Sequence, residues 1–316
     1  MTGVERFREK EVEARKLPSL SSRNAQIDIG FHAAQRHRCI QAIMEVRFRF
    51  LQVNGAILMF CLRSLICVLC LTQLPNFLMA DQGVLDEDSK RPHVVMLVAE
   101  REYATMRSLK EFAQEHDKTC RATIVAEDPD DRNSLVGLEC LQNADLLLVS
   151  VRRRTLPDEQ LDQIRKFVAS GKPVIGIRTA SHAFSLRNRQ PPEGRAVWQD
   201  FDQMVFGGNY TNHHGNDLQV ELSAVETGSN HPIMKGINSS RRYLSSSSLY
   251  RVSPLLAKTE VLMRGRVKGH ASEPVAWTFR RADGGKSFYT SLGNTEDFKG
   301  DVLPVLLVNA ISWCLN

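Results

Sequence analysis

The sequence has little of what a disulfide-stabilised, zinc-binding or membrane-spanning protein needs. Only 7 of its 316 residues are cysteine, and Cys120, Cys140 and Cys314 are the ones beyond residue 80. They are odd in number and show no CxxC spacing, so we expect buried thiols, with a single bridge as the alternative. The apolar run at residues 65–71 is far shorter than the roughly 20 residues of a membrane helix.

The chain beyond residue 80 also lacks an excess of charge. Residues 1–80 contain 11 Lys/Arg and 6 Asp/Glu, whereas residues 81–316 contain 30 of each. The net charge of +5 therefore comes entirely from the first segment. We expect no nucleic-acid partner, because a phosphate backbone is bound by clustered positive charge.

The N-terminal segment predicts export. Residues 59–80 contain Arg63, the apolar run, Pro75 and a small Ala80 before Asp81, which is the layout of a cleaved secretory signal peptide. We interpret residues 1–58 as an over-called start or a disordered prefix, and residues 81–92 as a linker. The expected location is periplasmic or secreted, without stable membrane insertion after cleavage. An uncleaved N-terminal membrane anchor is the alternative.

Residues 93–316 alternate between strand and helix patterns. The continuous apolar runs are typical of strands buried on both faces, and short links between them favour βαβ crossovers. The sequence predicts an α/β fold with a doubly wound, mainly parallel sheet. The expected strands are residues 93–99, 120–126, 145–151 and 173–177, and the expected helices are residues 103–116, 134–141 and 157–169.

The second half adds further short strands. Residues 218–225, 260–264, 274–280 and 286–292 have strand patterns, and the last two are joined by an Ala-Asp-Gly-Gly hairpin turn. We also expect residues 180–189 to start as a helix and dissolve into a Pro/Arg loop, residues 198–206 to form a short helix, and a closing helix that Asp301 caps.

Polar side chains follow three of the predicted strands. Ligands in a doubly wound sheet collect at the carboxyl ends of its strands. These ends carry Glu100 and Arg101, then Ser150 and Arg152 to Arg154, then Arg178, Thr179, Ser181 and His182. We interpret Arg153 and Arg154 as solvated loop residues, and Glu100 and Arg178 as functional ones.

The residues after the fourth strand have the pattern of a nucleophile elbow. A strand runs into a tight turn and a helix at PVIGIRTASHAF, but the nucleophile position holds Arg178. No Cys–His pair is available there, which argues against amidotransferase or peptidase chemistry.

Histidines supply the remaining candidates. His213 and His214 occupy a Gly/Asn-rich loop, and Asp217 could orient one ring or complete a metal site with His182. No HxH or HExxH pattern is present, so the cofactor stays unknown, with a metal as one alternative. His231 is most simply a turn residue and His270 a surface residue.

The ordered segments of the second half resemble the ThuA-like (trehalose utilisation) family. The segments are PVIGIRTASHAF, WQDFDQMVFGGNYTNHHG, NHPIMKGI, SSLYRV, EPVAWTF, GGKSFYTSLGNTEDF and LLVNAISWCLN. The resemblance covers residues 93–316 and implies a class I glutamine amidotransferase-like (flavodoxin-like) fold without the glutaminase nucleophile. It also implies an association with sugar metabolism, particularly disaccharides and their keto forms.

Two departures from the family pattern bear on activity. The usual Asp-Glu-Leu-Tyr is Ser247-Ser248-Leu249-Tyr250 here, and the usual Gly-His near the last strand is Gly293-Asn294, followed by Glu296. If the family's activity depends on that Asp-Glu pair or on that histidine, this protein has lost the activity, or Glu296 and Asp297 have taken over the function of the missing side chains.

Our leading hypothesis is an exported protein that binds a carbohydrate at the strand ends and processes it by acid/base isomerisation or hydrolysis. A non-catalytic carbohydrate-binding or scaffold module and a metal-dependent hydrolase are the alternatives, and a homo-oligomer is compatible with the sequence. The acid/base candidates are His182, His213 and His214. The expected substrate-binding residues are Glu100, Arg101, Arg178, Thr179, Ser181, Trp198, Tyr210, Tyr250, Asn294 and Glu296.

Overall fold

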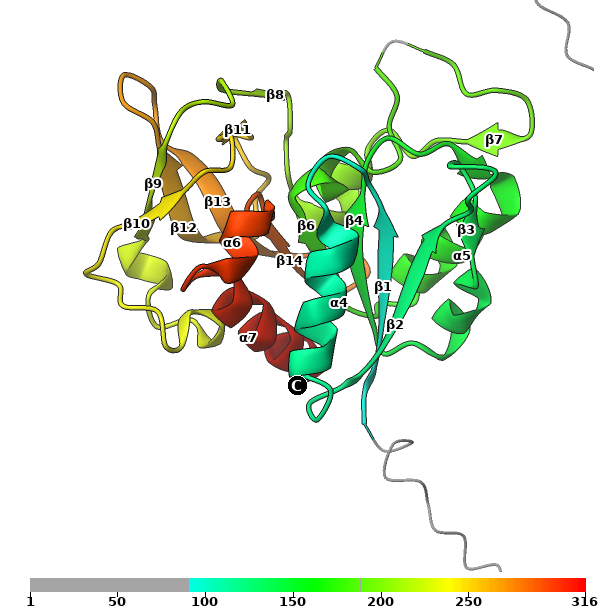
Figure 1. Cartoon of the computed structure of the whole chain (residues 1–316), viewed down its shortest axis with the longest axis horizontal. Helices are drawn as coiled ribbons and strands as arrows, with labels where there is room; N and C mark the ends of the chain where they lie inside the picture. The colour runs from blue at the N-terminus through cyan, green and yellow to red at the C-terminus, as the bar shows by residue number, and fades with distance from the viewer. Residues whose placement is uncertain (1–90, 188) are drawn as a thin grey trace, which may run out of the picture. The chain divides into compact units, whose positions relative to one another are not determined.

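The computed structural model describes residues 91–187 and 189–316, which build one mixed ten-stranded sheet (Figure 1). The strand order is β10-β9-β12-β13-β14-β6-β4-β1-β2-β3. Pairings among β14, β6, β4, β1 and β2 are parallel, and β13, β12, β9 and β10 continue the sheet with antiparallel pairings. Most strands consequently point the same way, as the sequence predicts.

The parallel half holds the four strands expected from the apolar runs. β1 is buried along its whole length, because helices cover both faces of this part of the sheet. The strands are β1 (His93–Ala99), β2 (Arg121–Glu127), β4 (Leu146–Val151) and β6 (Val174–Ile177), with β14 (Lys286–Thr290) beside β6.

The antiparallel half comes from the second half of the chain. β13 and β14 form the predicted hairpin, whose turn contains Gly284 at φ 85°. Glycine adopts this left-handed conformation without the steric cost that other residues incur. The strands are β9 (Val220–Ala224), β10 (Tyr243–Ser245), β12 (Thr259–Arg266) and β13 (Glu273–Arg280).

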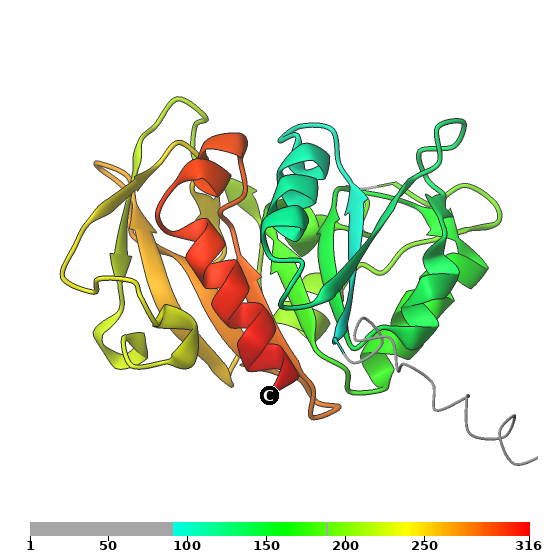
Figure 2. The same cartoon turned by 60° about the horizontal axis from the view of Figure 1, so that its bottom comes forward.

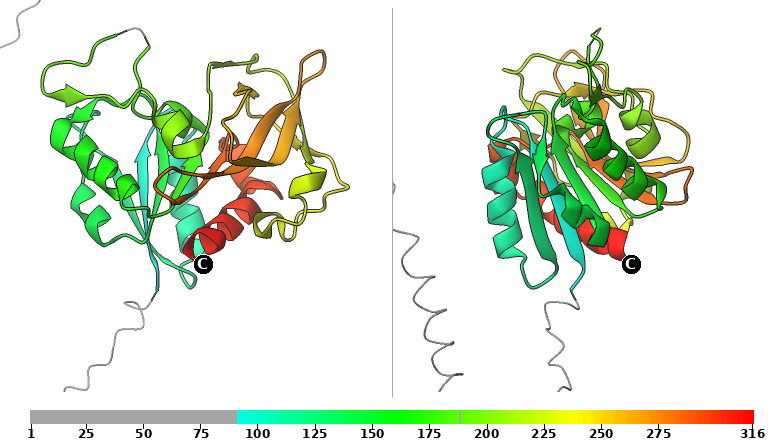
Figure 3. Two further views of the ribbon diagram at one scale, coloured as in Figure 1. Left: turned by 180° about the vertical axis from the view of Figure 1, so that it is seen from behind. Right: turned by 90° about the vertical axis from the view of Figure 1, so that its right-hand side faces the viewer.

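Helices cover both faces of the sheet (Figure 3). On one face lie α4 (Thr105–Glu115), α6 (Thr295–Lys299) and α7 (Leu303–Leu315), as Figure 2 shows. On the other lies α5 (Asp158–Ala169). Alternate residues of β1 pack into two separate apolar cores, one with Leu109 of α4 and one with Leu161 of α5.

Short elements complete the described chain. Two pairs of short strands lie outside the main sheet, β5 with β7 and β8 with β11. The short strands and short helices are β3 (Leu135–Val136), η1 (Leu138–Asn143), β5 (Leu156–Pro157), η2 (Arg178–His182), β7 (Arg195–Ala196), η3 (Asp202–Phe206), β8 (Asn212–His213), η4 (Glu226–Gly228), η5 (Pro232–Met234) and β11 (Tyr250–Arg251).

Three local predictions are wrong. Residues 134–141 form a short strand and a 3-10 helix, because Gly137 has φ 80° between them. The helix expected at residues 198–206 is reduced to the single turn η3, whereas the helical start expected near residue 180 is present as η2. Asp301 does not cap α7, whose N-cap is Val302, and its carboxylate lies 3.2 Å from Arg241 instead.

The three cysteines beyond residue 80 are free thiols; Cys120 and Cys314 are buried and Cys140 is partly so. In the described part of the chain, no helix is long and apolar enough to cross a membrane. The predicted prefix, signal peptide and most of the linker lie outside the described residues.

Candidate functional site

The turn after β6 has the backbone geometry of an elbow. Arg178 follows the strand directly and has φ 45°, a left-handed conformation that costs a non-glycine residue energy. The buried hydroxyl of Tyr289 donates to the Arg178 carbonyl at 2.5 Å and holds the turn in place. Such strain marks a position where the fold directs a side chain to a particular place.

The Arg178 side chain fills the space at this elbow. Only 2% of it is exposed, and its guanidinium stacks on Tyr103 at 4.1 Å and on Tyr250 at 4.9 Å from the ring centres. Its Nη atoms donate to the Ser291 carbonyl at 2.9 Å and to the Ser248 hydroxyl at 3.0 Å, while its Nε lacks a partner. Arg178 is thus a buried cation enclosed by protein.

Glu100 is engaged within its own turn. Its carboxylate accepts hydrogen bonds from the backbone of Glu102, Tyr103 and Thr105 at 2.7–2.9 Å, and from the Thr105 hydroxyl at 2.6 Å. Four donors occupy the carboxylate at the start of α4, where a negative charge is favourable. The structure gives Glu100 a structural task.

Three other predicted ligands lie outside the open pockets described below. Arg101 is exposed and pairs with Glu127. Thr179 is buried with an unpartnered hydroxyl. Trp198 packs edge-on against Phe201 in the core, with its ring centre 5.1 Å away.

His182, at the end of the elbow, lines an open pocket. It has a volume of about 370 Å³, and we call it the His182 pocket; its lining includes Arg153, Ser181, His182, Arg187, Asp202, Asn209 and Tyr210. The His182 ring stacks on Tyr210 with centres 4.5 Å apart and planes 23° apart. The predicted residues Ser181, His182 and Tyr210 therefore come together here.

The surroundings of His182 keep its imidazole neutral. Burial lowers its pKa well below the usual value, and the charges of Arg153, Arg152 and Arg187 lower it further. The Ser181 hydroxyl donates to the Arg178 carbonyl at 3.4 Å, so we assign the proton to His182 Nδ1, which lies 3.1 Å from Ser181 Oγ. A lone pair then remains on Nε2, as a general base requires.

Asp202 is a pocket residue that the sequence reasoning missed. Its carboxyl is 7% exposed, Oδ2 accepts from the Tyr210 backbone at 2.8 Å, and Oδ1 has no partner. Burial raises its pKa to about 7. The spacing of Trp198, Asp202 and Val205 places this carboxyl on an apolar helical face, and that signal could have revealed it.

The arginines after β4 also differ from the prediction. Arg154 is 2% exposed and pairs with Glu127 at 2.5 Å, and Arg153 is half-buried in the His182 pocket. The solvated-loop interpretation of both residues is therefore wrong. The backbone N–H groups of Arg153 and Arg154 donate to the carbonyls of His182 and Ala183, which tie this turn to η2.

The twin histidines point to different neighbours. His213 of β8 pairs with Tyr250 of β11, with ring centres 6.3 Å apart, and Tyr250 lies 6.1 Å from His182. His214 instead contacts His270, at 4.3 Å between ring centres. His182, Tyr210, Tyr250 and His213 thus form a continuous ring cluster, whereas the His214 ring contacts His270.

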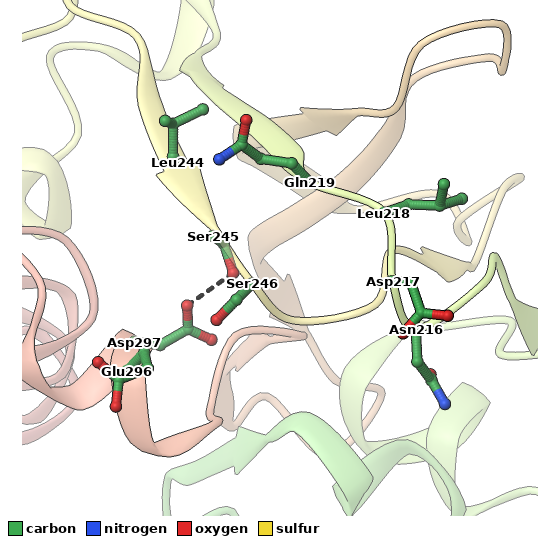
Figure 4. A pocket seen from close by; sticks show the side chains of 9 residues that line it. All are labelled: Asn216, Asp217, Leu218, Gln219, Leu244, Ser245, Ser246, Glu296 and Asp297. Carbon is green, nitrogen blue, oxygen red and sulfur yellow. Dashed lines mark hydrogen bonds between the residues drawn. The ribbon is translucent and has the colours of Figure 1, made fainter.

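A second pocket, of about 460 Å³, lies beside α6 (Figure 4). Glu296 lines it, and Asp297 accepts from the hydroxyls of Ser245 and Ser247 at 2.6 and 2.5 Å. Asn294 donates to Ser246, which also lines it, at 2.9 Å. Of the predicted ligands, Glu296 therefore lines this pocket and Asn294 contacts a residue that lines it, and neither lines the His182 pocket.

Asp217 lines the second pocket, whereas His182 lines the first. Among residues 91–187 and 189–316, no group of three or more His, Cys, Asp or Glu side chains is arranged to hold a metal ion.

The comparisons agree with this architecture. The family model described as "ThuA: Trehalose utilisation" matches residues 95–314. A ThuA-like protein from Bacteroides uniformis has a similar structure, with 16% identity and a TM-score of 0.53, over 71% of this chain and 92% of that one. A ThuA-like protein from Parabacteroides merdae gives 13% identity and a TM-score of 0.53, over 72% and 90%. At these identities the likeness concerns the fold. No curated protein matches the chain.

Proposed function

Because the chain belongs to the ThuA (trehalose utilisation) family, we propose that it binds a carbohydrate in the His182 pocket and catalyses a proton transfer on it. The observation that carries the proposal is that the neutral, Tyr210-stacked His182 and the carboxyl of Asp202, whose pKa burial raises to about 7, line one pocket. In acid/base sites, two titratable groups typically lie in environments that shift their pKa values in opposite directions, so that one acts as the base and the other as the acid.

The proposed reaction is enolisation of a keto-sugar, a disaccharide or a smaller ketose. His182 Nε2 takes the proton from the carbon beside the carbonyl. The partnerless oxygen of Asp202 is buried against Gly208, so the proposed reaction requires the protonated carboxyl to turn toward the sugar. It then donates a hydrogen bond to the carbonyl oxygen as negative charge develops there. The Tyr210 ring holds the imidazole plane by stacking. Return of the proton from His182 to the former carbonyl carbon completes an isomerisation, while the hydroxyl proton on the carbon that was deprotonated moves to the former carbonyl oxygen.

The test follows hydrogen exchange, which needs no knowledge of the product. Ketoses and keto-disaccharides are incubated with the protein in D₂O, and NMR records loss of the C–H signal beside the carbonyl. We expect exchange with at least one of these sugars, and a loss of about 100-fold or more in His182→Gln. The matched control is His116→Gln at the far end of α4, which leaves the exchange rate unchanged.

A non-catalytic carbohydrate-binding module is the second candidate. It is favoured by Ser247 and Ser248, which stand where the family has two carboxylates. Ser247 donates to Asp297 and Ser248 accepts from Arg178, so neither position supplies a carboxylate for catalysis. Binding of a sugar without any exchange would support this candidate and contradict the proton transfer.

We further propose that the protein is exported after cleavage between Ala80 and Asp81. The proposal rests on the charged, apolar and small-residue regions of residues 59–80. N-terminal sequencing of the protein from its native cell should begin at Asp81. A chain that begins at or near residue 1 would contradict export by this signal.

A further inference from the structure

Two arginines line the His182 pocket without a carboxylate partner. Within residues 91–187 and 189–316, neither Arg153 nor Arg187 forms an ion pair. The flanking arginines differ: Arg152 pairs with Glu102 at 2.7 Å, and Arg154 pairs with Glu127. Within this turn, carboxylates therefore neutralise Arg152 and Arg154, but none in the described part of the chain neutralises Arg153, which lines the pocket between them.

The backbone holds Arg153 at the pocket at an energetic cost. Arg153 has φ 50°, a left-handed conformation, and its N–H donates to the His182 carbonyl at 3.1 Å. Its Nη1 donates to the Ser185 carbonyl at 3.3 Å, which leaves most of the guanidinium donors without a protein acceptor. A half-buried cation with a strained backbone and unused hydrogen-bond donors is typical of a residue that binds a ligand.

The electrostatics of the pocket are unfavourable when it is empty. Burial lowers the pKa of Arg153, and the positive charge of Arg187 lowers it further, so the two guanidinium groups repel each other. The same charges act on His182. A negative group placed between them would remove this repulsion and offset the burial of Arg153.

The acidic residues of the pocket do not supply that negative group. Asp200 is exposed and forms no ion pair with either arginine. Asp202 is buried, and its Oδ2 is occupied by the Tyr210 backbone. Ser185, Asn209 and Tyr210 add only neutral polar groups.

We infer that the carbohydrate bound in the His182 pocket carries an anionic group, a carboxylate or a phosphate, which Arg153 and Arg187 bind together. The inference rests on the proposed carbohydrate function and names its substrate class. Guanidinium groups suit this task, because their planar donor pairs match the oxygens of carboxylate and phosphate. The arginines hold the substituent, and His182 and Asp202 remain for the reacting carbons.

The test compares matched neutral and anionic sugars by isothermal titration calorimetry. Glucose, glucuronate and glucose 6-phosphate share one ring and differ in the group at carbon 6. We expect at least one anionic sugar to bind about tenfold or more tightly than glucose, as a charge-assisted pair of contacts provides. The glucuronate and phosphate arms distinguish a sugar acid from a sugar phosphate.

Two variants and a control locate the effect. Arg153→Gln and Arg187→Gln should each reduce anionic binding to the level of glucose while changing glucose binding less than about twofold. Arg187 is exposed, so its variant remains informative if Arg153→Gln fails to fold. Arg152→Gln is the matched control, because Arg152 belongs to the same turn, pairs with Glu102 and does not line the pocket.

The outcomes separate the inference from the proposed function. Equal binding of all three sugars, unchanged in both variants, overturns the inference and leaves the carbohydrate function standing. Binding of inorganic phosphate that depends on Arg153, with no binding of any sugar, supports the anion site and overturns the carbohydrate function.

Discussion

At the scale of single residues, Glu100 shows how a carboxylate at a strand end can serve structure. Its two oxygens accept four hydrogen bonds within residues 102–105, so they have little capacity left for a ligand. A side chain in this position organises the start of α4 and thereby the position of Tyr103, which covers Arg178.

We predict that Glu100→Gln destabilises the protein without abolishing sugar binding. The amide offers one acceptor oxygen and turns an N–H group toward backbone donors, which leaves buried donors unpaired. The free energy of unfolding should fall by about 1–3 kcal/mol. Urea denaturation measures the loss, and calorimetry measures sugar affinity in the same sample. A fully stable variant with no affinity would show that Glu100 binds substrate directly.

Asp202 gives the protein a pH-dependent stability. Its folded-state pKa of about 7 lies above the ordinary value of 3.8, so the folded state holds this proton more tightly than the unfolded state. The stabilisation is complete below the unfolded pKa and is lost as the pH rises through about 7. Above that pH the fold contains a buried charge with one partnerless oxygen.

We therefore predict that the free energy of unfolding of the wild type falls as the pH rises through about 7, and that Asp202→Asn removes this part of the fall. Between about pH 5 and pH 8 the wild type should lose about 3 kcal/mol more of its unfolding free energy than the variant does. Urea titrations of both proteins at the two pH values measure the difference, and other titrating groups cancel in the comparison. Parallel pH profiles would show that the carboxyl is already ionised in the folded protein at low pH.

At the scale of elements, the junction of β6 with η2 combines a tightly packed strand with a strained turn. A Cβ on Gly176 would lie 2.5 Å from Phe206 Cζ and 2.8 Å from Tyr289 Cδ2, and both rings are fully buried. Tyr289 in turn holds the Arg178 carbonyl. Glycine in the strand thus lets two aromatic rings approach the backbone and fix the turn.

We predict that Gly176→Ala lowers the free energy of unfolding by about 1–3 kcal/mol, the usual cost of overpacking. Gly215→Ala is the control, because the nearest atom to its added Cβ is Leu218 Cδ1 at an ordinary 3.6 Å. Thermal and urea denaturation of both variants measure the effect. If Gly176→Ala were as stable as the control, the packing around β6 would have room that the structure does not show.

Regular elements could be predicted from the sequence, and single turns could not. The apolar runs of β1, β4 and β6 are dictated by burial on both faces, and their prediction is confirmed. η3 ends before Gly207 at φ 64°, as the glycine predicts, but it lacks the first residues of the helix expected there, and residues 199–200 form a turn instead. Tertiary contacts decide such short segments, and local pattern carries little information about them.

The site was predictable in part for the same reason. Arg178, Ser181 and His182 follow a strand whose end is fixed by the fold, so their common location could be inferred. The stacking of Tyr210 on His182 and the pairing of Tyr250 with His213 join segments that no periodicity connects. Asn294 and Glu296 lie at the second pocket, because β10 and α6 bring their own loops together there.

At the scale of the whole molecule, the two halves of the sheet have different tasks. The parallel half provides the buried strands whose ends carry the elbow and the Arg153 turn (Figure 1). The antiparallel half returns the chain so that β8 and β11 add Tyr250 and His213 to the same ring cluster. The pocket chemistry therefore depends on segments from both halves of the chain.

The distribution of charge at this scale argues against a nucleic-acid ligand, although arginines gather at the pocket. Residues 81–316 contain 30 basic and 30 acidic residues, and several arginines, such as Arg152, Arg154 and Arg195, form ion pairs with nearby carboxylates. Arg153 and Arg187 occupy one small pocket and could contact only one or two phosphates. Binding of a duplex instead requires many phosphate contacts along a surface.

We predict that residues 81–316, produced as a fragment, do not bind duplex DNA or single-stranded RNA at a salt concentration of about 0.15 M. Two phosphate contacts would give weak binding whose affinity falls only slightly as the salt concentration rises, whereas the affinity of nucleic-acid-binding proteins falls steeply. Fluorescence anisotropy with labelled oligonucleotides measures this. The full chain is the comparison, because its excess of +5 lies in residues 1–80 and any binding it shows should disappear in the fragment. Tight, steeply salt-dependent binding by the fragment would mean that its basic residues form an extended surface, and the pocket arginines would then need a different explanation from a sugar's anionic group.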